Sequence, residues 1–207
     1  MLANEEFSSN PFDAARAGLC EDILTFLCDE VDIDEPNKHG NTMLMLAAFH
    51  GHADAVELLL QKGANPLAVN ENNSTVLQFG SRNRAVLSLL LSTRAVEHIN
   101  HQDDDGISPL IRATNIREGV FNELDLTAIP ERLVCVNMLL GAGADVDLAS
   151  DKGRTALMNA AYIGDVDLVG ALLLAKPSIG MVCSAGKRAM EWAVKDEIKS
   201  LLSASAA

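Results

Sequence analysis

Two stretches far apart in the chain repeat one pattern: residues 40–48 read GNTMLMLAA, and residues 153–161 read GRTALMNAA. Each holds a glycine, then a threonine of the kind that caps a helix, then an apolar run that ends in paired alanines. Positions that open such stretches recur every 33 residues in two runs: Gly40, Asn73 and Gly106, then Gly153 and Gly186. A fixed period of this length predicts a protein built from stacked repeats.

Each unit predicts a pair of helices. A hydroxyl side chain can cap the first helix, and the four such residues are Thr42, Thr75, Ser108 and Thr155. In the best-formed unit, Gly51 separates this helix from a second one, which carries a leucine stripe and ends near Gly63, a residue suited to the left-handed conformation. One helix pair cannot bury its apolar faces alone, whereas stacked pairs can.

This pattern resembles the ankyrin-repeat family, which has a 33-residue period and the signature T-P-L-H-x-A. The resemblance rests on the period, the paired alanines and the GAN and GAD corners, and it covers about residues 11–202. It implies an all-α solenoid of stacked helix pairs with short β-hairpin-like turns, forming a single domain over residues 1–207. We expect six units, of which the outer two are caps: 11–37, 38–70, 71–103, 104–150, 151–183 and 184–207.

The sequence departs from the family signature in two ways. The signature histidine, which in the family ties adjacent turns together through hydrogen bonds, is replaced throughout: by Met45, Gln78, Ile111 and Met158. This puts the rigidity of the turns in question. The third unit is the most degenerate, because Gly80 and Ser81 stand where alanines belong and Arg94 stands where the second unit has Gly63.

The fourth unit contains an insertion of about 14 residues, near residues 116–130, with the sequence IREGVFNELDLTAIP. Its position between the two helices of the unit leaves three readings open. The segment could be a loop that folds its apolar residues back on the stack, a projecting element that gives Phe121 and Leu124 to a partner, or a disordered stretch. Apolar anchors inside a polar rim are typical of protein interfaces.

The family resemblance also implies where a partner would bind. Ankyrin proteins commonly bind ligands on the concave face, which is formed by the turn tips and the first helix of each pair. Exposed aromatic and apolar side chains at such positions are typical of contact sites. The candidate partner-binding residues on this face and in the insertion are Lys38, His39, Asn41, Phe49, His50, Arg82, Asn83, Asp104, Asp105, Ile107, Asn115, Ile116, Phe121, Leu124, Arg154, Tyr162 and Ile163. We expect Trp192 to lie in the core of the C-terminal cap.

The charge is strongly negative, with 29 acidic and 16 basic residues and a net of −13. This argues against a nucleic-acid partner and against an anionic membrane, because both need a surplus of Lys and Arg. The acidity is segmental: residues 1–36 carry −9 and residues 97–151 carry −8. We expect Asp103 to Asp105 at one turn tip, and Asp145, Asp147 and Asp151 at the next. Such a patch could steer a basic partner, or it could be a solvated face.

No sequence motif for catalysis, cofactor binding or metal binding is found. His50 and His52 lack further ligands at suitable spacing, so we expect no metal, no cofactor and no enzymatic activity. The four cysteines form no CxxC pair and are interpreted as small buried hydrophobes in a reducing compartment: Cys20, Cys28, Cys135 and Cys183. Neither a signal peptide nor a membrane-length apolar run is found, so we expect a cytoplasmic protein.

The sequence therefore predicts a protein–protein interaction module, working as a monomer through its concave face and the insertion. Its partner is expected to be another protein, with a basic surface as one option. Three alternatives stay open: an inhibitor or immunity-type protein that blocks a basic toxin or enzyme, a secreted bacterial effector that binds a host protein, and a sensor of small molecules. Fold alone does not separate them.

Overall fold

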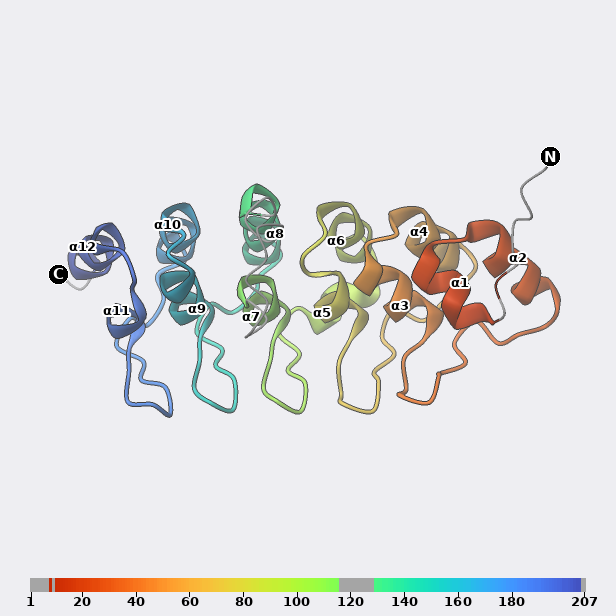
Figure 1. The fold of residues 1–207 in the computed structure, drawn as a ribbon, viewed down its shortest axis with the longest axis horizontal. Helices are drawn as coiled ribbons and strands as arrows, with labels where there is room; N and C mark the ends of the chain where they lie inside the picture. Colours follow the sequence, from red (N-terminus) through yellow and green to blue (C-terminus); the bar gives the residue numbers. More distant parts are fainter. Residues whose placement is uncertain (1–7, 9, 116–128, 206–207) are drawn as a thin grey trace.

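The computed structural model describes residues 8, 10–115 and 129–205. Over these ranges the chain forms an elongated row of helix pairs, with the N-terminal pair at one end and the C-terminal pair at the other (Figure 1). Within them the only β-structure is a pair of isolated antiparallel bridges, Val69 with Thr75 and Ala149 with Thr155. The predicted all-α solenoid with hairpin-like turns is confirmed.

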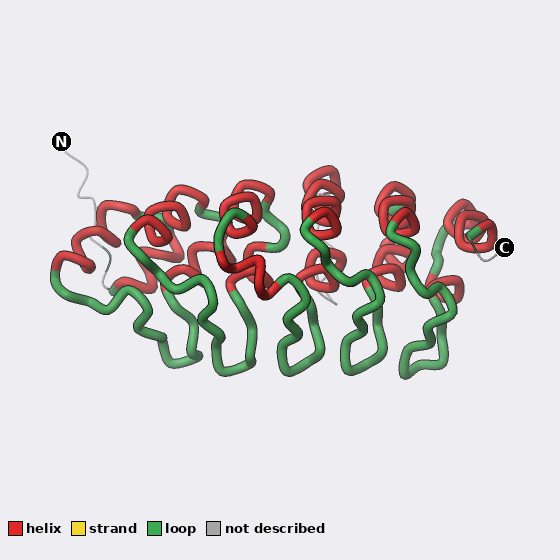
Figure 2. Tube along the Cα trace, turned by 180° about the vertical axis from the view of Figure 1, so that it is seen from behind, coloured by secondary structure: helices red, strands yellow, loops and turns green. Residues whose placement is uncertain are grey.

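The pairs follow one another along the row, and the loops between them extend to one side (Figure 2). The first helices are α1 (Pro11–Ala17), α3 (Met43–His50), α5 (Val76–Gly80), α7 (Pro109–Thr114), α9 (Ala156–Ile163) and α11 (Ala189–Trp192). The second helices are α2 (Cys20–Cys28), α4 (Ala53–Gln61), α6 (Arg84–Leu91), α8 (Ile129–Gly141), α10 (Val166–Leu174) and α12 (Asp196–Ala204). A 3₁₀-helix, η1 (Arg94–His98), follows α6.

Local signals set the ends of the first helices. The hydroxyls of Thr42, Thr75, Ser108 and Thr155 each accept a hydrogen bond from the backbone N–H three residues later, so the predicted caps are confirmed. Gly51 and Gly164 end α3 and α9 in the left-handed conformation, with φ of 80° and 77°. A side chain is strained there, so glycine fixes where each helix stops.

The interior of the row is aliphatic and continuous from pair to pair. In the first helices, Ala47, Ala48, Ala160 and Ala161 are at most 1% exposed. In the second helices, one leucine per unit is fully buried at the same structural position: Leu59, Leu90, Leu139 and Leu172. Each of these large side chains contributes roughly 1.5–3 kcal/mol when it leaves water, so the stack is stabilised mainly by contacts between neighbouring units.

Adjacent turn tips are joined by backbone hydrogen bonds, although the signature histidine is missing. In each case an N–H at one tip donates to a carbonyl at the preceding tip: Glu71 to His39 at 3.4 Å, Asp104 to Asn72 at 3.1 Å, Asp151 to Asp105 at 3.0 Å, and Ser184 to Lys152 at 2.9 Å. These backbone hydrogen bonds connect neighbouring turns, and no side-chain substitution removes them directly.

Gln78 adds a side-chain tie at the position of the signature histidine. Its Oε1 accepts a hydrogen bond from the backbone N–H of Thr75 at 2.6 Å, which completes a capping box. Its Nε2 donates to the backbone carbonyl of Ile107 in the next unit. Gln78 therefore links two turns, and the loss of the signature histidine is compensated at this unit.

Gly80, one of the unusual residues of the third unit, is explained by close packing. Helix α5 has 5 residues where α3 has 8. A Cβ added to Gly80 would lie 2.7 Å from Leu90 Cδ1 and 2.7 Å from Val86 Cγ1 of α6. Glycine is therefore required for α6 to approach α5 this closely. Beyond α6, Thr93 caps η1, which replaces the glycine turn of the second unit.

The cysteines differ from one another in burial. Cys135 and Cys183 are buried as expected, but Cys20 is partly exposed and Cys28 is exposed. The expectation of burial is wrong for Cys28, which ends α2 in the terminal pair, where fewer neighbours cover the helix. Burial, followed by the nearby charge of Glu131, raises the pKa of the Cys135 thiol to about 11, so this thiol stays protonated at neutral pH.

Within the described ranges, every helix is too short or too polar to cross a lipid bilayer.

We predict that Gln78→Met lowers the free energy of unfolding by about 2 kcal/mol, because it removes two hydrogen bonds and leaves the buried backbone N–H of Thr75 without its partner. Methionine is the residue that the second and fifth units use at this position. Urea unfolding measures the change. As a control, Met158→Leu alters packing alone and should cost less than about 1.5 kcal/mol. Equal effects of the two substitutions would show that the Gln78 tie contributes nothing.

We predict that Gly80→Ala destabilises the protein by about 1–3 kcal/mol, because the added methyl overpacks the contact between α5 and α6. The matched control is Gly170→Ala in α10, where a Cβ meets no atom within 4 Å. In that open helical position alanine should stabilise by about 0.5–1 kcal/mol. Thermal unfolding compares the two variants, and the same sign for both would contradict the packing explanation.

Candidate partner-binding groove

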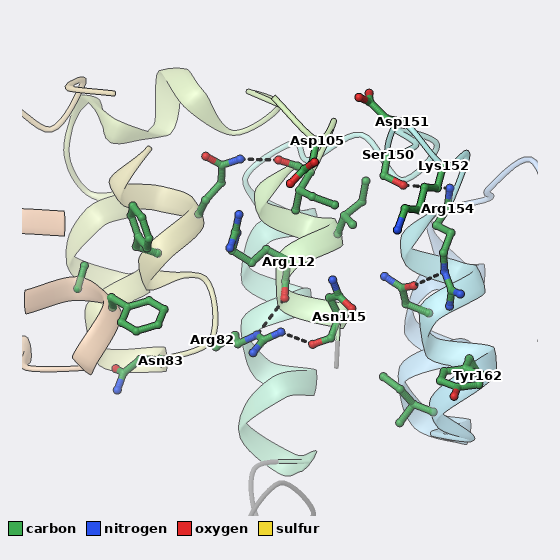
Figure 3. A pocket seen from close by; sticks show the side chains of 18 of the residues that line it. Arg82, Asn83, Asp105, Arg112, Asn115, Ser150, Asp151, Lys152, Arg154 and Tyr162 are labelled. Carbon is green, nitrogen blue, oxygen red and sulfur yellow. Dashed lines mark hydrogen bonds between the residues drawn. The ribbon is translucent and has the colours of Figure 1, made fainter. Parts of the chain in front are cut away.

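An open cavity of about 660 Å³ lies between the turn tips and the first helices of the second to fifth units (Figure 3). We call it the concave groove. Its lining consists of Ala48, Phe49, His50, Gly51, Gln78, Phe79, Arg82, Asn83, Asp105, Ile107, Ile111, Arg112, Asn115, Ser150, Asp151, Lys152, Arg154, Asn159, Tyr162 and Ile163.

The repeat period explains why these side chains meet. Residues that hold the same place in successive units point to the same side of the stack, so they form columns. One column, near the ends of the first helices, contains Phe49, Arg82, Asn115 and Tyr162. Another occupies the variable position of the family signature and contains Phe79, Arg112 and Asn159.

The N-terminal half of the groove is apolar. The rings of Phe49 and Phe79 meet edge to face, with centroids 5.7 Å apart. Phe49 remains 44% exposed. Ile107 adds apolar surface from the next turn, and the guanidinium of Arg112 lies 6.0 Å from the centroid of the Phe79 ring. An exposed aromatic side chain that is already held by its neighbours loses little conformational entropy when a partner covers it.

Arg82 bridges two units in the middle of the groove. Its Nε donates to the backbone carbonyl of Arg112 at 3.0 Å, and an Nη donates to the carbonyl of Asn115. These carbonyls lie at the C-terminal end of α7, where a helix leaves acceptors unpaired and carries partial negative charge. Figure 3 shows both bonds. Arg82 thus caps the C-terminal end of α7 and holds this part of the groove surface in place.

The C-terminal half combines aromatic rings with cations. The guanidinium of Arg154 lies 4.2 Å from the centroid of the Trp192 ring and 5.5 Å from that of Tyr162. The two rings meet edge to face at 5.7 Å, and Lys187 Nζ lies 4.7 Å from the Trp192 ring. Trp192 is only partly buried and packs beside the groove, so placing it simply in the cap core is incomplete.

The groove is less acidic than the chain as a whole. Besides His50, its lining holds four basic side chains, Arg82, Arg112, Lys152 and Arg154, and two acidic ones, Asp105 and Asp151. Burial, then the charges of His52 and Arg16, lower the pKa of His50, so His50 is neutral at pH 7. A surface with net positive lining thus sits within a chain of charge −13.

The expected acidic patch is smaller than the sequence indicated. Asp103 is only 8% exposed, and its carboxylate pairs with Arg112 at 2.6 Å while accepting the backbone N–H of Ile107 at 2.8 Å. Asp147 accepts the N–H and the hydroxyl of Ser178, at 2.7 and 2.6 Å, in the connection that follows α8. The expected tip position is therefore wrong for Asp147 and for its neighbour Asp145, which share this corner.

The structure places the seventeen candidate residues in four groups. Ten line the concave groove: Phe49, His50, Arg82, Asn83, Asp105, Ile107, Asn115, Arg154, Tyr162 and Ile163. Lys38, His39 and Asp104 are exposed at turn tips. Asn41 lines a smaller neighbouring depression, and its side chain accepts a hydrogen bond from Asn70 at 2.8 Å. Ile116, Phe121 and Leu124 lie outside the described residues.

Sequence reasoning missed Phe79, Arg112 and Asn159. All three occupy the variable position of the family signature. A comparison of that position between units could have found them, because a position left free by the fold is available for recognition. Among the described residues, no group of three or more His, Cys, Asp or Glu side chains converges as metal ligands would.

Comparisons with known proteins agree with this architecture. A family model described as ankyrin repeats in three copies matches residues 12–103 and 126–206. The nuclear factor NF-kappa-B p105 subunit of Gallus gallus is 31% identical over 146 residues, which are 69% of this chain and 13% of that protein. The ANK repeat-containing protein nipk-1 of Caenorhabditis elegans is 28% identical over 161 residues, 74% of this chain and 26% of that protein.

A solved structure has the same fold. An ankyrin repeat domain from Acinetobacter baumannii AYE superposes with a TM-score of 0.75 at 21% identity, covering 95% of this chain and 97% of that one. The chain spans only about a quarter or less of the two curated relatives above. Their whole activities and partners therefore do not transfer directly.

We predict that Asp103→Asn lowers the free energy of unfolding by about 1–3 kcal/mol, because it breaks a largely buried charge pair with Arg112. Asp104→Asn, at the adjacent exposed tip position, removes the same charge and should change stability by less than about 0.5 kcal/mol. Urea unfolding of both variants measures the difference. Equal, small effects of the two substitutions would show that Asp103 acts as a solvated surface acid and that its pair with Arg112 does not stabilise the fold.

Proposed function

Because the chain belongs to the ankyrin-repeat family, we propose that it is a non-catalytic module that binds a segment of a partner protein in the concave groove. Ankyrin repeats generally act in protein–protein interaction, and the groove supplies a contact surface of this kind. We propose that the chain works as a monomer. The expected cytoplasmic location stays a prediction.

The observation that carries the proposal is the exposure of two aromatic side chains on one face. Phe49 is 44% exposed and Tyr162 is 40% exposed, and both line the same groove. Arg82 and Arg154 lie beside them. Aromatic and arginine side chains inside a polar rim are the residues that most often dominate the free energy of binding at protein interfaces.

The insertion is proposed as a second contribution to the same interface. The described chain before it ends at Asn115, which lines the groove. Because the insertion follows Asn115 directly in the sequence, we propose that it extends the contact surface. The proposed anchors Phe121 and Leu124 stay predictions.

The alternatives differ in the charge they require of the partner. An inhibitor that covers a basic toxin or enzyme needs an acidic contact surface, and the groove lining carries more basic than acidic side chains. A basic partner would fit better at the N-terminal end, where residues 1–36 carry −9. A bacterial effector that binds a host protein is compatible with the same groove, and so is a sensor role. Every one of these hypotheses except the inhibitor uses the concave groove as the binding site.

Site-specific photo-crosslinking tests the proposal. A photoreactive phenylalanine analogue replaces Phe49 or Tyr162 in the groove, and replaces Leu174 as the control. Leu174 is 85% exposed at the end of α10 and does not line the groove. We predict that both groove positions crosslink to the same protein in the native cell and that the Leu174 position does not.

Purified proteins then measure the contribution of each side chain. Phe49→Ala and Tyr162→Ala should each weaken binding of that protein by at least 1 kcal/mol, as buried aromatic anchors do, while Leu174→Ala leaves binding unchanged. Equal crosslinking at all three positions, or unchanged affinity in both groove variants, would contradict binding in the concave groove.

A further inference from the structure

We propose that the concave groove takes an extended acidic segment of the partner, with a carboxylate on Arg154 and an apolar side chain on the Phe49–Phe79 surface. This rests on the proposed function and specifies the chemistry of the partner. It reverses, for this surface, the expectation of a basic partner that the overall charge of −13 suggested.

Arg154 is positioned as a carboxylate receptor. Its Nε donates to Asn159 Oδ1 at 3.1 Å, and its guanidinium lies over the Trp192 ring, 4.2 Å from the centroid, and 5.5 Å from the centroid of the Tyr162 ring. Among the described residues, its two terminal Nη groups have neither a hydrogen-bond acceptor nor an ion-pair partner, although the side chain is partly buried. A guanidinium held flat by aromatic rings presents a rigid fork that matches a carboxylate.

Two lysines strengthen the positive field around Arg154. Lys152 lines the groove from the same turn tip as Arg154, and Lys187 Nζ lies 4.7 Å from the centroid of the Trp192 ring. In the part of the chain that the structure describes, neither lysine forms an ion pair. Asp105 and Asp151 also line the groove, so the three cations Arg154, Lys152 and Lys187 stand against two carboxylates. The cations raise the encounter rate of an acidic segment.

The two halves of the groove have different chemistry, which sets the register of the occupant. In the N-terminal half, Arg112 is already neutralised by Asp103, so the exposed feature there is the edge-to-face pair of Phe49 and Phe79. In the C-terminal half, the cations around Arg154 dominate. A segment that lies along the groove therefore places an apolar residue toward the first half and an acidic residue toward the second.

A nucleic-acid strand is the other polyanion that the cations could attract, and the remaining observations favour a protein segment. The whole chain is strongly acidic and repels a long polyanion, whose phosphates would extend beyond the groove. The Phe49–Phe79 surface also gives an apolar side chain a site that a phosphate backbone does not use.

Binding of defined peptides to the full chain tests the proposal. Three fluorescein-labelled peptides of equal length alternate Leu with Glu, Gln or Lys, and a fluorescein-labelled oligonucleotide is the fourth probe. Anisotropy measures affinity. The fluorescence of Trp192, the single tryptophan, reports occupancy of the Arg154 half directly.

The variants are Arg154→Gln and Lys187→Gln. The matched control is Lys176→Gln, which removes one positive charge outside the groove.

We expect the Glu peptide to bind about tenfold more tightly than the Gln peptide, the Lys peptide to bind least, and Trp192 fluorescence to change with the Glu peptide. Arg154→Gln should weaken the Glu peptide about tenfold and leave the Gln peptide unchanged, while Lys176→Gln has less than a twofold effect. Lys187→Gln should also weaken the Glu peptide, which keeps the proposal testable if Arg154→Gln unfolds. Added salt should weaken the Glu peptide selectively.

Equal binding of the Glu and Gln peptides, preference for the Lys peptide, or tighter binding of the oligonucleotide would overturn the acidic chemistry. A second experiment separates this failure from failure of the proposed function. Each peptide is added as a competitor while the photoreactive residue at position 49 or 162 crosslinks to the partner protein. If the Gln or Lys peptide displaces the crosslinked protein, the groove binds a partner of different charge. If the groove positions crosslink to no protein, the proposed function fails, whatever the peptides do.

Discussion

Every feature of this molecule depends on the burial of each helix pair against the next one. A single pair has too little apolar surface to offset the entropy of ordering its chain, and stacking supplies the missing contacts. The paired alanines at 47–48 and 160–161 bring first helices together, and the leucine column from Leu59 to Leu172 fills the layer behind them. The backbone hydrogen bonds between turn tips are possible only because this packing holds the tips in line.

The same stacking creates the groove. Residues with equal positions in successive units align, so a choice of side chain at one position becomes a column on the surface. Where packing dictates the position, the column is alanine or leucine. Where the fold leaves it free, the column is varied, as in Phe49, Arg82, Asn115 and Tyr162. This separation lets a repetitive core carry a non-repetitive surface, with an apolar half and a cationic half.

The period, the caps and the helix breaks could be predicted from the sequence because each depends on local chemistry. The site was harder, because it depends on contacts between units. Asp103 reads as a surface acid until its partner Arg112 is seen, and Phe79 lies at a position that the signature leaves undefined. Gln78 looked like a loss of the signature histidine, and it proved to cap its own helix and to donate a hydrogen bond to the next turn. The insertion lies mostly outside the described residues, so its role stays a prediction.

Hydrogen exchange of the full chain, with and without a bound partner, tests the central claim that recognition occurs along the concave groove. The account predicts slower exchange at the turn tips and in the first helices α3, α5, α7 and α9, and little change in α4, α6 and α10 on the opposite layer. Slower exchange confined to the second helices, or to the acidic N-terminal end, would contradict it.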